Sequence, residues 1–201
     1  MIPTTWPEER QSMAEHAKDV APDTASRIRE VALELFTRQG YEKTSLREIA
    51  AALGITKAAV YYHYRSKVDI LDDLLRPVAD EEEKILADSR AAGLAGPAAR
   101  MRVVERYIDL LLCHRELVAY VMNDITGAST SRMVPRLQGH DKELMSLLAE
   151  ADLPLADRVR TLSAIGVIMA VVTMPDVPAA ELRPLVLDVV RDVLGIRDES
   201  E

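Results

Sequence analysis

Apolar residues recur at steps of three and four along most of the chain, a period typical of helices that bury one face. The pattern is clear from residue 24 to residue 40, where the apolar stripe comprises Ile28, Val31, Ala32, Leu35 and Phe36. Thr24 is placed to cap this helix and Gly40 to end it. The pattern therefore predicts a first helix with one buried side.

Two short helices follow on tight turns. Ser45 and Glu48 have the spacing of a capping box, and Gly54 ends the helix that they open. Thr56 can then cap a third helix over residues 57–64. A short helix, a glycine corner and another short helix form the helix-turn-helix arrangement, whose second helix lies in the DNA major groove. A hairpin in an ordinary helical bundle uses the same devices, so the spacing alone leaves both interpretations open.

The remainder of the chain is also helical in pattern. Ser66, with Asp69 three residues later, can cap a fourth helix, and Pro77 is expected to kink or break it. No strand-like alternation follows. Six more helical segments are predicted, over residues 78–93, 97–114, 115–127, 131–151, 155–174 and 179–195. The sequence therefore predicts an all-α protein.

Charge is distributed unevenly. The chain has a net charge of -8, yet residues 38–67 hold six Lys or Arg against two Glu, so this window carries +4 and the rest carries -12. An acidic average surface would repel the phosphate backbone, which excludes a protein that coats nucleic acid uniformly. A basic patch on an acidic body instead favours contact with a polyanion at one place.

The third helix carries three of the six tyrosines of the chain. Val60 and Tyr64 share one face, four residues apart, and are expected to pack on the first two helices. The remaining rings project elsewhere, with Lys57 beside them. Exposed tyrosine hydroxyls donate hydrogen bonds to phosphate, and small residues such as Ala58 let a helix backbone approach the bases. This surface suits a DNA groove.

These stretches resemble a known family. The segment "TSLREIAAALGITKAAVYYHYRSKVDIL", preceded by "ALELFTRQGY", is similar to the N-terminal DNA-binding domain of the TetR family of transcriptional repressors over about residues 24–76. The resemblance implies a three-helix DNA-binding head over residues 24–70 and a helical body over residues 71–201 for effector binding and dimerisation. Residues 1–23, which hold three prolines and no apolar period, are expected to form a mobile tail.

The resemblance also implies which residues of the head meet DNA. The set is Thr44, Thr56, Lys57, Ala58, Tyr61, Tyr62, His63 and Lys67. Within it, Lys67 corresponds to a phosphate contact at the start of the fourth helix. The two threonines have an alternative role, because threonine hydroxyls also cap helices.

No motif in the body names a ligand. A small-molecule site mixes apolar groups with a few polar ones, and such a mixture occurs in the middle helices. The candidate ligand-binding residues are Tyr107, His114, Tyr120, Met122, Asn123, Met133, Arg136 and His140. The alternative is that the methionines fill the core and the histidines are solvated.

The last two helices predict a subunit interface. Residues 162–174 are apolar almost all round, which a helix tolerates only when it is covered on most sides. We expect a homodimer, because two heads one DNA turn apart read a palindromic operator; a purely intramolecular core is the alternative. The expected interface residues are Leu162, Ile165, Gly166, Met169, Ala170, Leu185, Val189 and Val193.

Other classes of protein lack their signatures. No nucleophile, base and acid set, phosphate loop or metal-ligand spacing is found, so no enzyme, metal or cofactor is predicted. Cys113 lies in an apolar pattern and is expected to be buried and inert. With no signal sequence and no membrane-spanning run, a cytoplasmic location is expected. An effector-responsive repressor is the leading hypothesis; an activator, or an interaction module that does not bind DNA, is the alternative.

Overall fold

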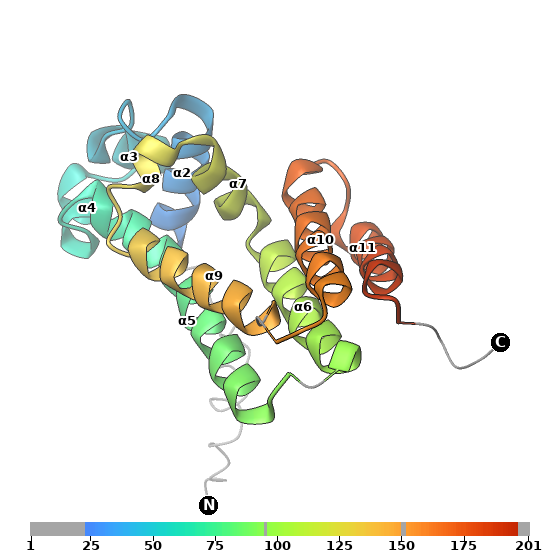
Figure 1. Cartoon of the computed structure of the whole chain (residues 1–201). Coiled ribbons are helices and arrows are strands. Elements are labelled where there is room, and N and C mark those ends of the chain that lie inside the picture. The colour runs from blue at the N-terminus through green and yellow to red at the C-terminus, as the bar shows by residue number, and fades with distance from the viewer. Residues whose placement is uncertain (1–22, 95, 150–151, 197–201) are drawn as a thin grey trace, which may run out of the picture.

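The computed structural model describes residues 23–94, 96–149 and 152–196, and every regular element in those ranges is an α-helix (Figure 1). The predicted all-α class is confirmed; of the tail predicted over residues 1–23, all but Asp23 lies outside the described ranges. The helices are α2 (Thr24–Gln39), α3 (Leu46–Leu53), α4 (Lys57–His63), α5 (Lys67–Ala92), α6 (Gly96–Cys113), α7 (Arg115–Asn123), α8 (Ile125–Ala128), α9 (Val134–Leu148), α10 (Leu155–Thr173) and α11 (Ala179–Leu194).

The helix ends of the N-terminal part follow the local sequence. Ser45 Oγ accepts a hydrogen bond from Glu48 N at 3.2 Å, while Glu48 Oε2 accepts one from Ser45 N at 2.8 Å, which completes the predicted capping box. Gly54 has the left-handed backbone (φ 67°) that the corner after α3 requires. The predicted cap at Thr24 is wrong. Asp23 holds the N-cap position of α2, without a side-chain cap bond, and Thr24 is the first helical residue.

Pro77, which was expected to kink or break its helix, does not break it. Helix α5 runs through it without interruption for 26 residues. Proline removes one helix hydrogen bond, but both halves of α5 are held from outside, since α5 packs against α2, α6 and α9 and buries Leu75 and Val78 on either side of the proline. The predicted boundary after residue 70 therefore falls inside a continuous helix that head and body share.

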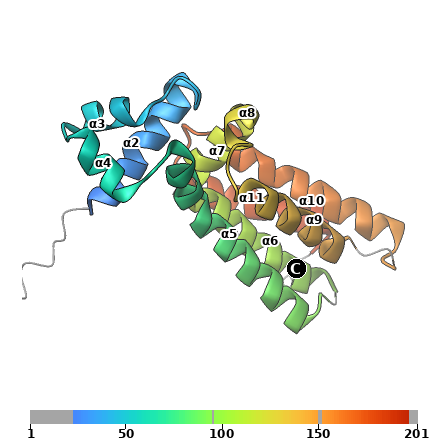
Figure 2. The ribbon, with the colours of Figure 1, turned by 90° about the vertical axis from the view of Figure 1, so that its left-hand side faces the viewer.

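Helices α2, α3 and α4 form the head with the start of α5. Its core contains Ile28, Phe36, Ile49 and Val60, all at most 1% exposed. Tyr64, which follows α4, is also buried, as its spacing from Val60 predicts. Figure 2 shows this small group of helices set at one end of the longer helices of the body.

The body is a bundle in which α5 packs on α6 and α9, and α10 packs on α6, α7 and α11. Helix α7 also contacts α2, so it links the bundle to the head (Figure 1). No helix in the described ranges has both the length and the apolar character needed to cross a membrane.

Candidate DNA-binding surface and ligand cavity

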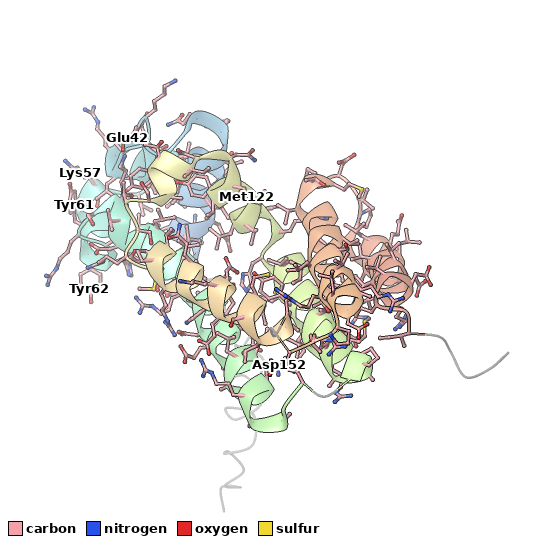
Figure 3. All side chains as sticks on the ribbon, in the orientation of Figure 1. Glu42, Lys57, Tyr61, Tyr62, Met122 and Asp152 are labelled. Carbon is pink, nitrogen blue, oxygen red and sulfur yellow. The ribbon has the colours of Figure 1, made fainter. Side chains whose placement is uncertain are left out.

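The corner between α3 and α4 fixes how α4 is presented. After Gly54, Thr56 Oγ1 accepts a hydrogen bond from Ala59 N at 3.1 Å and caps α4. Val60 turns inward and is fully buried. The opposite side of α4 therefore faces outward, as Figure 3 shows for Lys57, Tyr61 and Tyr62. The cap that sequence analysis left as an alternative role for Thr56 is present.

The outer surface of α4 is aromatic and basic. Tyr62 is 87% exposed and Tyr61 45% exposed. Lys57 Nζ lies 5.2 Å from the centroid of the Tyr61 ring, and the His63 ring meets Tyr62 edge-on at 5.2 Å between centroids. Ala58 is exposed among them. Rings of this kind pack on sugars and donate to phosphate oxygens, while lysine supplies charge. The predicted groove-facing residues of α4 thus form one surface.

Tyr64 has a different role from its neighbours. Its hydroxyl donates to Asp73 Oδ2 at 2.7 Å and accepts from Arg29 Nη1 at 3.1 Å. Burial and the Asp73 carboxylate raise the pKa of Tyr64 to about 12. Burial opposes ionisation of Asp73, but the hydrogen bonds from Tyr64 and Arg29 outweigh it and lower the pKa of Asp73. The three side chains join α2, the end of α4 and α5.

Two residues implied at the DNA surface are placed differently. Thr44 is only 1% exposed, and its hydroxyl donates to Gly40 O at 2.9 Å. The expectation that its side chain meets DNA is therefore wrong. Lys67 Nζ donates to Tyr41 O at 2.6 Å and lies 4.2 Å from the centroid of the Tyr41 ring. Here Lys67 anchors the loop between α2 and α3, and its phosphate contact remains a prediction.

Three basic residues of the head were absent from the predicted contact set. Lys43, Arg47 and Arg65 are all exposed in the segment that carries the charge excess. The excess of Lys and Arg over residues 38–67 already indicated them. That count identifies a basic patch but does not say which of its side chains face outward. Arg38, another member of the patch, is partly neutralised by Glu34 at 3.3 Å.

A second feature is a cavity of about 390 Å³ inside the body. Side chains from α5, α6, α7, α9 and α10 converge on it, and most are apolar. The lining residues are Leu75, Val78, Glu82, Tyr107, Leu111, Val118, Val121, Met122, Leu137, Asp141, Met145, Ile165 and Val172. Of the predicted ligand-binding residues, Tyr107 and Met122 belong to this lining.

The polar groups of the cavity form one cluster. Tyr107 Oη donates to Asp141 Oδ1 at 2.7 Å and lies 3.5 Å from Glu82 Oε1. Glu82 is 5% exposed. Burial, aided by the charge of Asp141, raises the pKa of Glu82 to about 8. Burial and the two carboxylates also raise the pKa of Tyr107. This cluster can hold a proton or meet a polar group of a ligand.

Glu82 and Asp141 were not among the predicted ligand-binding residues. The signal for Glu82 was available, since Leu75, Val78 and Glu82 lie three and four residues apart on the buried face of α5. An acidic residue within an apolar stripe is a candidate site residue, because a buried charge is costly unless it is paired. Asp141 carried no such signal in the sequence.

Three other predicted ligand residues are engaged in packing or helix structure. Tyr120 is 2% exposed and stacks on Phe36 at 5.8 Å between centroids. Asn123 is exposed, and its side chain donates to Ala119 O within α7 at 2.9 Å. Met133 packs against the core just before α9. None of the three lines the cavity.

The last three predicted ligand residues are also outside the cavity lining. Arg136 pairs with Asp80 at 2.9 Å on the outer side of α9. His140 Nδ1 lies 3.2 Å from Glu82 Oε2, so it contacts the cluster without lining the cavity. His114 lies at the junction of α6 and α7 beside surface hollows, and burial lowers its pKa.

Cys113 lines the same surface hollows as its neighbour His114 and is exposed, contrary to expectation. It occupies the last turn of α6, where the helix leaves the bundle. Within the described residues, no group of His, Cys, Asp and Glu side chains is arranged to hold a metal ion.

The outer side of α10 and α11 carries exposed apolar side chains. Leu162, Leu185 and Val189 are 48%, 62% and 46% exposed, and Gly166 is exposed between them. Of the other predicted interface residues, Ile165 instead lines the cavity and Val193 is partly buried against the core. The side chains of Met169 and Ala170 lie outside the described set. An exposed apolar surface of this kind is typical of a subunit interface.

The head matches a known family. Residues 28–74 match the model for "Bacterial regulatory proteins, tetR family". The transcriptional regulator AcrR of Shigella flexneri is 44% identical over 62 residues, 31% of this chain and 29% of that protein. The transcriptional regulator TtgR of Pseudomonas putida is 25% identical over 138 residues, 69% of this chain and 60% of that protein. The chain thus spans less than two thirds of these curated relatives.

The likeness extends to the body at the level of structure. A solved member of the TetR transcriptional regulator family from Streptomyces coelicolor superposes with a TM-score of 0.62 and 26% identity, covering 88% of this chain and 92% of that one. Both the arrangement of the head and that of the bundle are therefore shared. The head therefore matches the DNA-binding domain of the TetR family of bacterial transcriptional regulators, and the helical body behind it is arranged as in a solved member of that family.

Proposed function

We propose that this chain is a homodimeric repressor of transcription that binds a palindromic DNA operator in the cytoplasm and is released by a small-molecule effector. The observation that carries the proposal is the outward surface of α4, where Lys57, Tyr61, Tyr62 and His63 are exposed next to a capped helix-turn-helix corner. A surface with three exposed polar-tipped rings in one turn has no role in the core of the head.

The rings and the cations have separate roles in this proposal. Ala58 lets α4 approach the base edges, while Tyr61 and Tyr62 meet sugar and phosphate at the groove walls. Lysine and arginine of the head release counterions from the DNA, so affinity falls as salt rises.

Dimerisation rests on the exposed apolar side of α10 and α11. Leu162, Leu185 and Val189 cover this side, and a second copy would remove them from water. A two-fold axis there duplicates the two helices into a four-helix interface and places two heads on one DNA face. The two copies of α4 would then enter successive major grooves about 34 Å apart.

Effector control rests on the cavity. Its wall includes Val118, Val121 and Met122 of α7, the helix that also contacts α2 of the head. A ligand that fits one position of α7 better than another shifts the population of head positions by its difference in affinity. Release of DNA follows if the favoured spacing no longer fits the operator.

Fluorescence anisotropy tests the proposal with labelled DNA from the region upstream of the gene. Binding is expected to be saturable, to compete poorly with unrelated duplexes and to weaken steeply with salt. Equal affinity for every duplex, or no affinity, contradicts it and favours a helical interaction module. A helical enzyme is not supported by any group of side chains described above. Transcript levels with and without the gene distinguish repression from activation.

A further inference from the structure

The walls of the body cavity restrict its ligand to a largely apolar molecule. Ten of the thirteen lining residues are Leu, Val, Ile or Met, and the three polar ones, Glu82, Tyr107 and Asp141, gather in one cluster. The apolar surface of a ligand is removed from water when it packs against these walls. A polar group of the ligand, by contrast, finds a hydrogen-bond partner only at this cluster. The ligand is therefore expected to carry one polar group on an apolar skeleton.

The sign of charge at the cluster is the next restriction. Glu82 and Asp141 are the charged residues among the cavity lining, and both are acidic. Arg136, a cation whose charge acts on Glu82, is paired with Asp80 at 2.9 Å and Glu83 at 3.5 Å and is not part of the cavity lining. His140 contacts Glu82 Oε2 at 3.2 Å from outside the lining. A ligand anion would meet two acidic side chains, with no cation among the residues of the cavity wall.

Tyr107 does not reverse this preference. Its hydroxyl proton is donated to Asp141 at 2.7 Å, which leaves an oxygen lone pair as the group it can offer to a ligand. Glu82 Oε1 lies 3.5 Å from the same hydroxyl, which is too distant for a strong hydrogen bond, and Glu82 as a residue is only 5% exposed. Once Glu82 is ionised, the cluster therefore presents only hydrogen-bond acceptors to the cavity and lacks a close donor for Glu82 Oε1.

We propose that the cavity binds a lipophilic amine, with its ammonium group held by Glu82 and Asp141 and its apolar skeleton against the Leu, Val and Met walls. This deepens the proposed function, because it names the chemical class of the effector. Ammonium supplies both the positive charge and the donors that the cluster lacks.

Protonation is coupled to this binding. Burial and the Asp141 charge hold the pKa of Glu82 near 8, so its carboxyl is largely protonated at neutral pH. The groups that face it are Tyr107 on α6, and His140, Asp141 and Arg136 on α9. A bound ammonium favours the ionised form of Glu82, which then loses its proton to solvent. Amine binding near pH 7 is therefore expected to release protons.

Three probes that share one apolar chain test the preference: decylamine, decanol and decanoate. Isothermal titration of the full chain without DNA is expected to show decylamine binding at least about tenfold more tightly than decanol, and decanoate most weakly. Titration in buffers of different ionisation enthalpy is expected to show proton release for decylamine alone. Equal affinity of amine and alcohol, or tighter binding of decanoate, overturns the proposal.

Glu82→Gln keeps the size of the side chain and removes its ionisation. It is expected to abolish the preference for decylamine and the proton release, while decanol binding persists as evidence that the cavity is intact. Glu83→Gln is the matched control, since it makes the same substitution at the next residue, which is exposed and lies outside the cavity lining. Asp141→Asn is a second variant, with a reduced preference expected. An unchanged preference in Glu82→Gln contradicts the proposal.

DNA binding is measured separately, so the two proposals fail separately. If the chain prefers decylamine through Glu82 but does not bind operator DNA, the proposed regulatory function is contradicted and the amine site is supported. If the chain binds operator DNA but shows no preference for the amine, only the proposal of an amine site is contradicted. If both hold, decylamine is expected to release the wild-type protein from operator DNA at concentrations that leave Glu82→Gln bound.

Discussion

The carboxylate of Asp124, at the end of α7, accepts a hydrogen bond of 2.9 Å from the backbone N–H of Tyr41 in the head. Its other oxygen accepts from Gly127 N at 2.9 Å. The carbonyl of Tyr41 in turn accepts a hydrogen bond of 2.6 Å from Lys67 Nζ. One carboxylate therefore connects the helix that lines the cavity to the loop that precedes the DNA-binding corner.

Removal of the Asp124 carboxylate tests how much this joint, the hydrogen-bonded contact of Asp124 with Tyr41 and Gly127, contributes to stability. Asp124→Ala leaves two backbone N–H groups without their acceptor and is expected to lower the free energy of unfolding by about 1–3 kcal/mol. Urea denaturation followed by circular dichroism measures it. Asn123→Ala is the control on the neighbouring residue, whose exposed side chain bonds only within its own helix, and a change within about 0.5 kcal/mol is expected. Equal effects of the two variants would show that the joint contributes no stability.

Gly127 allows the close approach at the same joint. A Cβ at this position would lie 2.5 Å from both Asp124 Oδ2 and Tyr41 Cβ, so Gly127→Ala forces α8 away from the head. A loss of about 1–3 kcal/mol is expected from overpacking. Gly139→Ala is the matched control, because a Cβ there meets no atom within 4 Å, and it is expected to stabilise α9 by roughly 0.5–1 kcal/mol. Thermal unfolding of both variants measures the contrast, and equal shifts of Tm contradict it.

The head could be predicted from sequence because its determinants are local. The box of Ser45 and Glu48, the left-handed Gly54 and the Thr56 cap each depend on residues within three positions of each other, and all are present. Thr44 could not be placed in this way. Its burial depends on how the α2–α3 loop folds back on α2, where its hydroxyl meets the carbonyl of Gly40.

The body shows where local pattern is insufficient. Pro77 predicts a kink or a break, but α5 is continuous through it and packs against three other helices. The cavity needs side chains from five helices, so periodicity could place Tyr107 inward but could not say that Tyr120 packs on Phe36 instead. Ile165 was expected at the subunit interface on similar grounds and lines the cavity.

The two kinds of tyrosine on and after α4 can be separated by substitution. Tyr62→Ala is expected to weaken operator binding about tenfold or more while changing stability by less than about 0.5 kcal/mol, because the ring is 87% exposed. Tyr64→Phe loses the bonds to Asp73 and Arg29 and is expected to cost about 1–2 kcal/mol of stability. Anisotropy and urea denaturation of both variants check the separation. A stability loss in Tyr62→Ala would place that ring in the core instead.

If the exposed apolar side of α10 and α11 is the dimer interface, a charge introduced there is expected to prevent dimerisation. Leu162→Asp and Val189→Asp, each on the exposed side of α10 or α11, are expected to yield monomers, because a charge buried at an apolar interface loses its hydration. Sedimentation velocity measures the mass. Ile125→Asp is the control, since Ile125 is an apolar residue 73% exposed on α8, away from that face, and is expected to leave the dimer intact. Dimers in all three variants contradict the assigned interface.

Glu82 predicts an unusual dependence of stability on pH. Its pKa is raised from 4.5 to about 8 in the folded chain, so between these values the folded state holds a proton that the unfolded state has lost. Stability from this group is complete below pH about 4.5 and is lost as pH rises through about 8. Glu82→Gln, which stays neutral, is expected to gain stability over the wild type across this window, on the order of a few kcal/mol at its upper end.

Urea denaturation at several pH values from about 5 to 9 measures this difference. Glu83→Gln provides the control, because it makes the same substitution at an exposed residue outside the cavity lining. Asp73 contributes in the opposite sense, since its lowered pKa gives stability that is lost only as pH falls into the acid range, below the window. A rising difference between Glu82→Gln and the wild type from pH 5 to 8 therefore reports on the cavity carboxyl. A flat difference would mean that Glu82 ionises in the folded chain as it does in water.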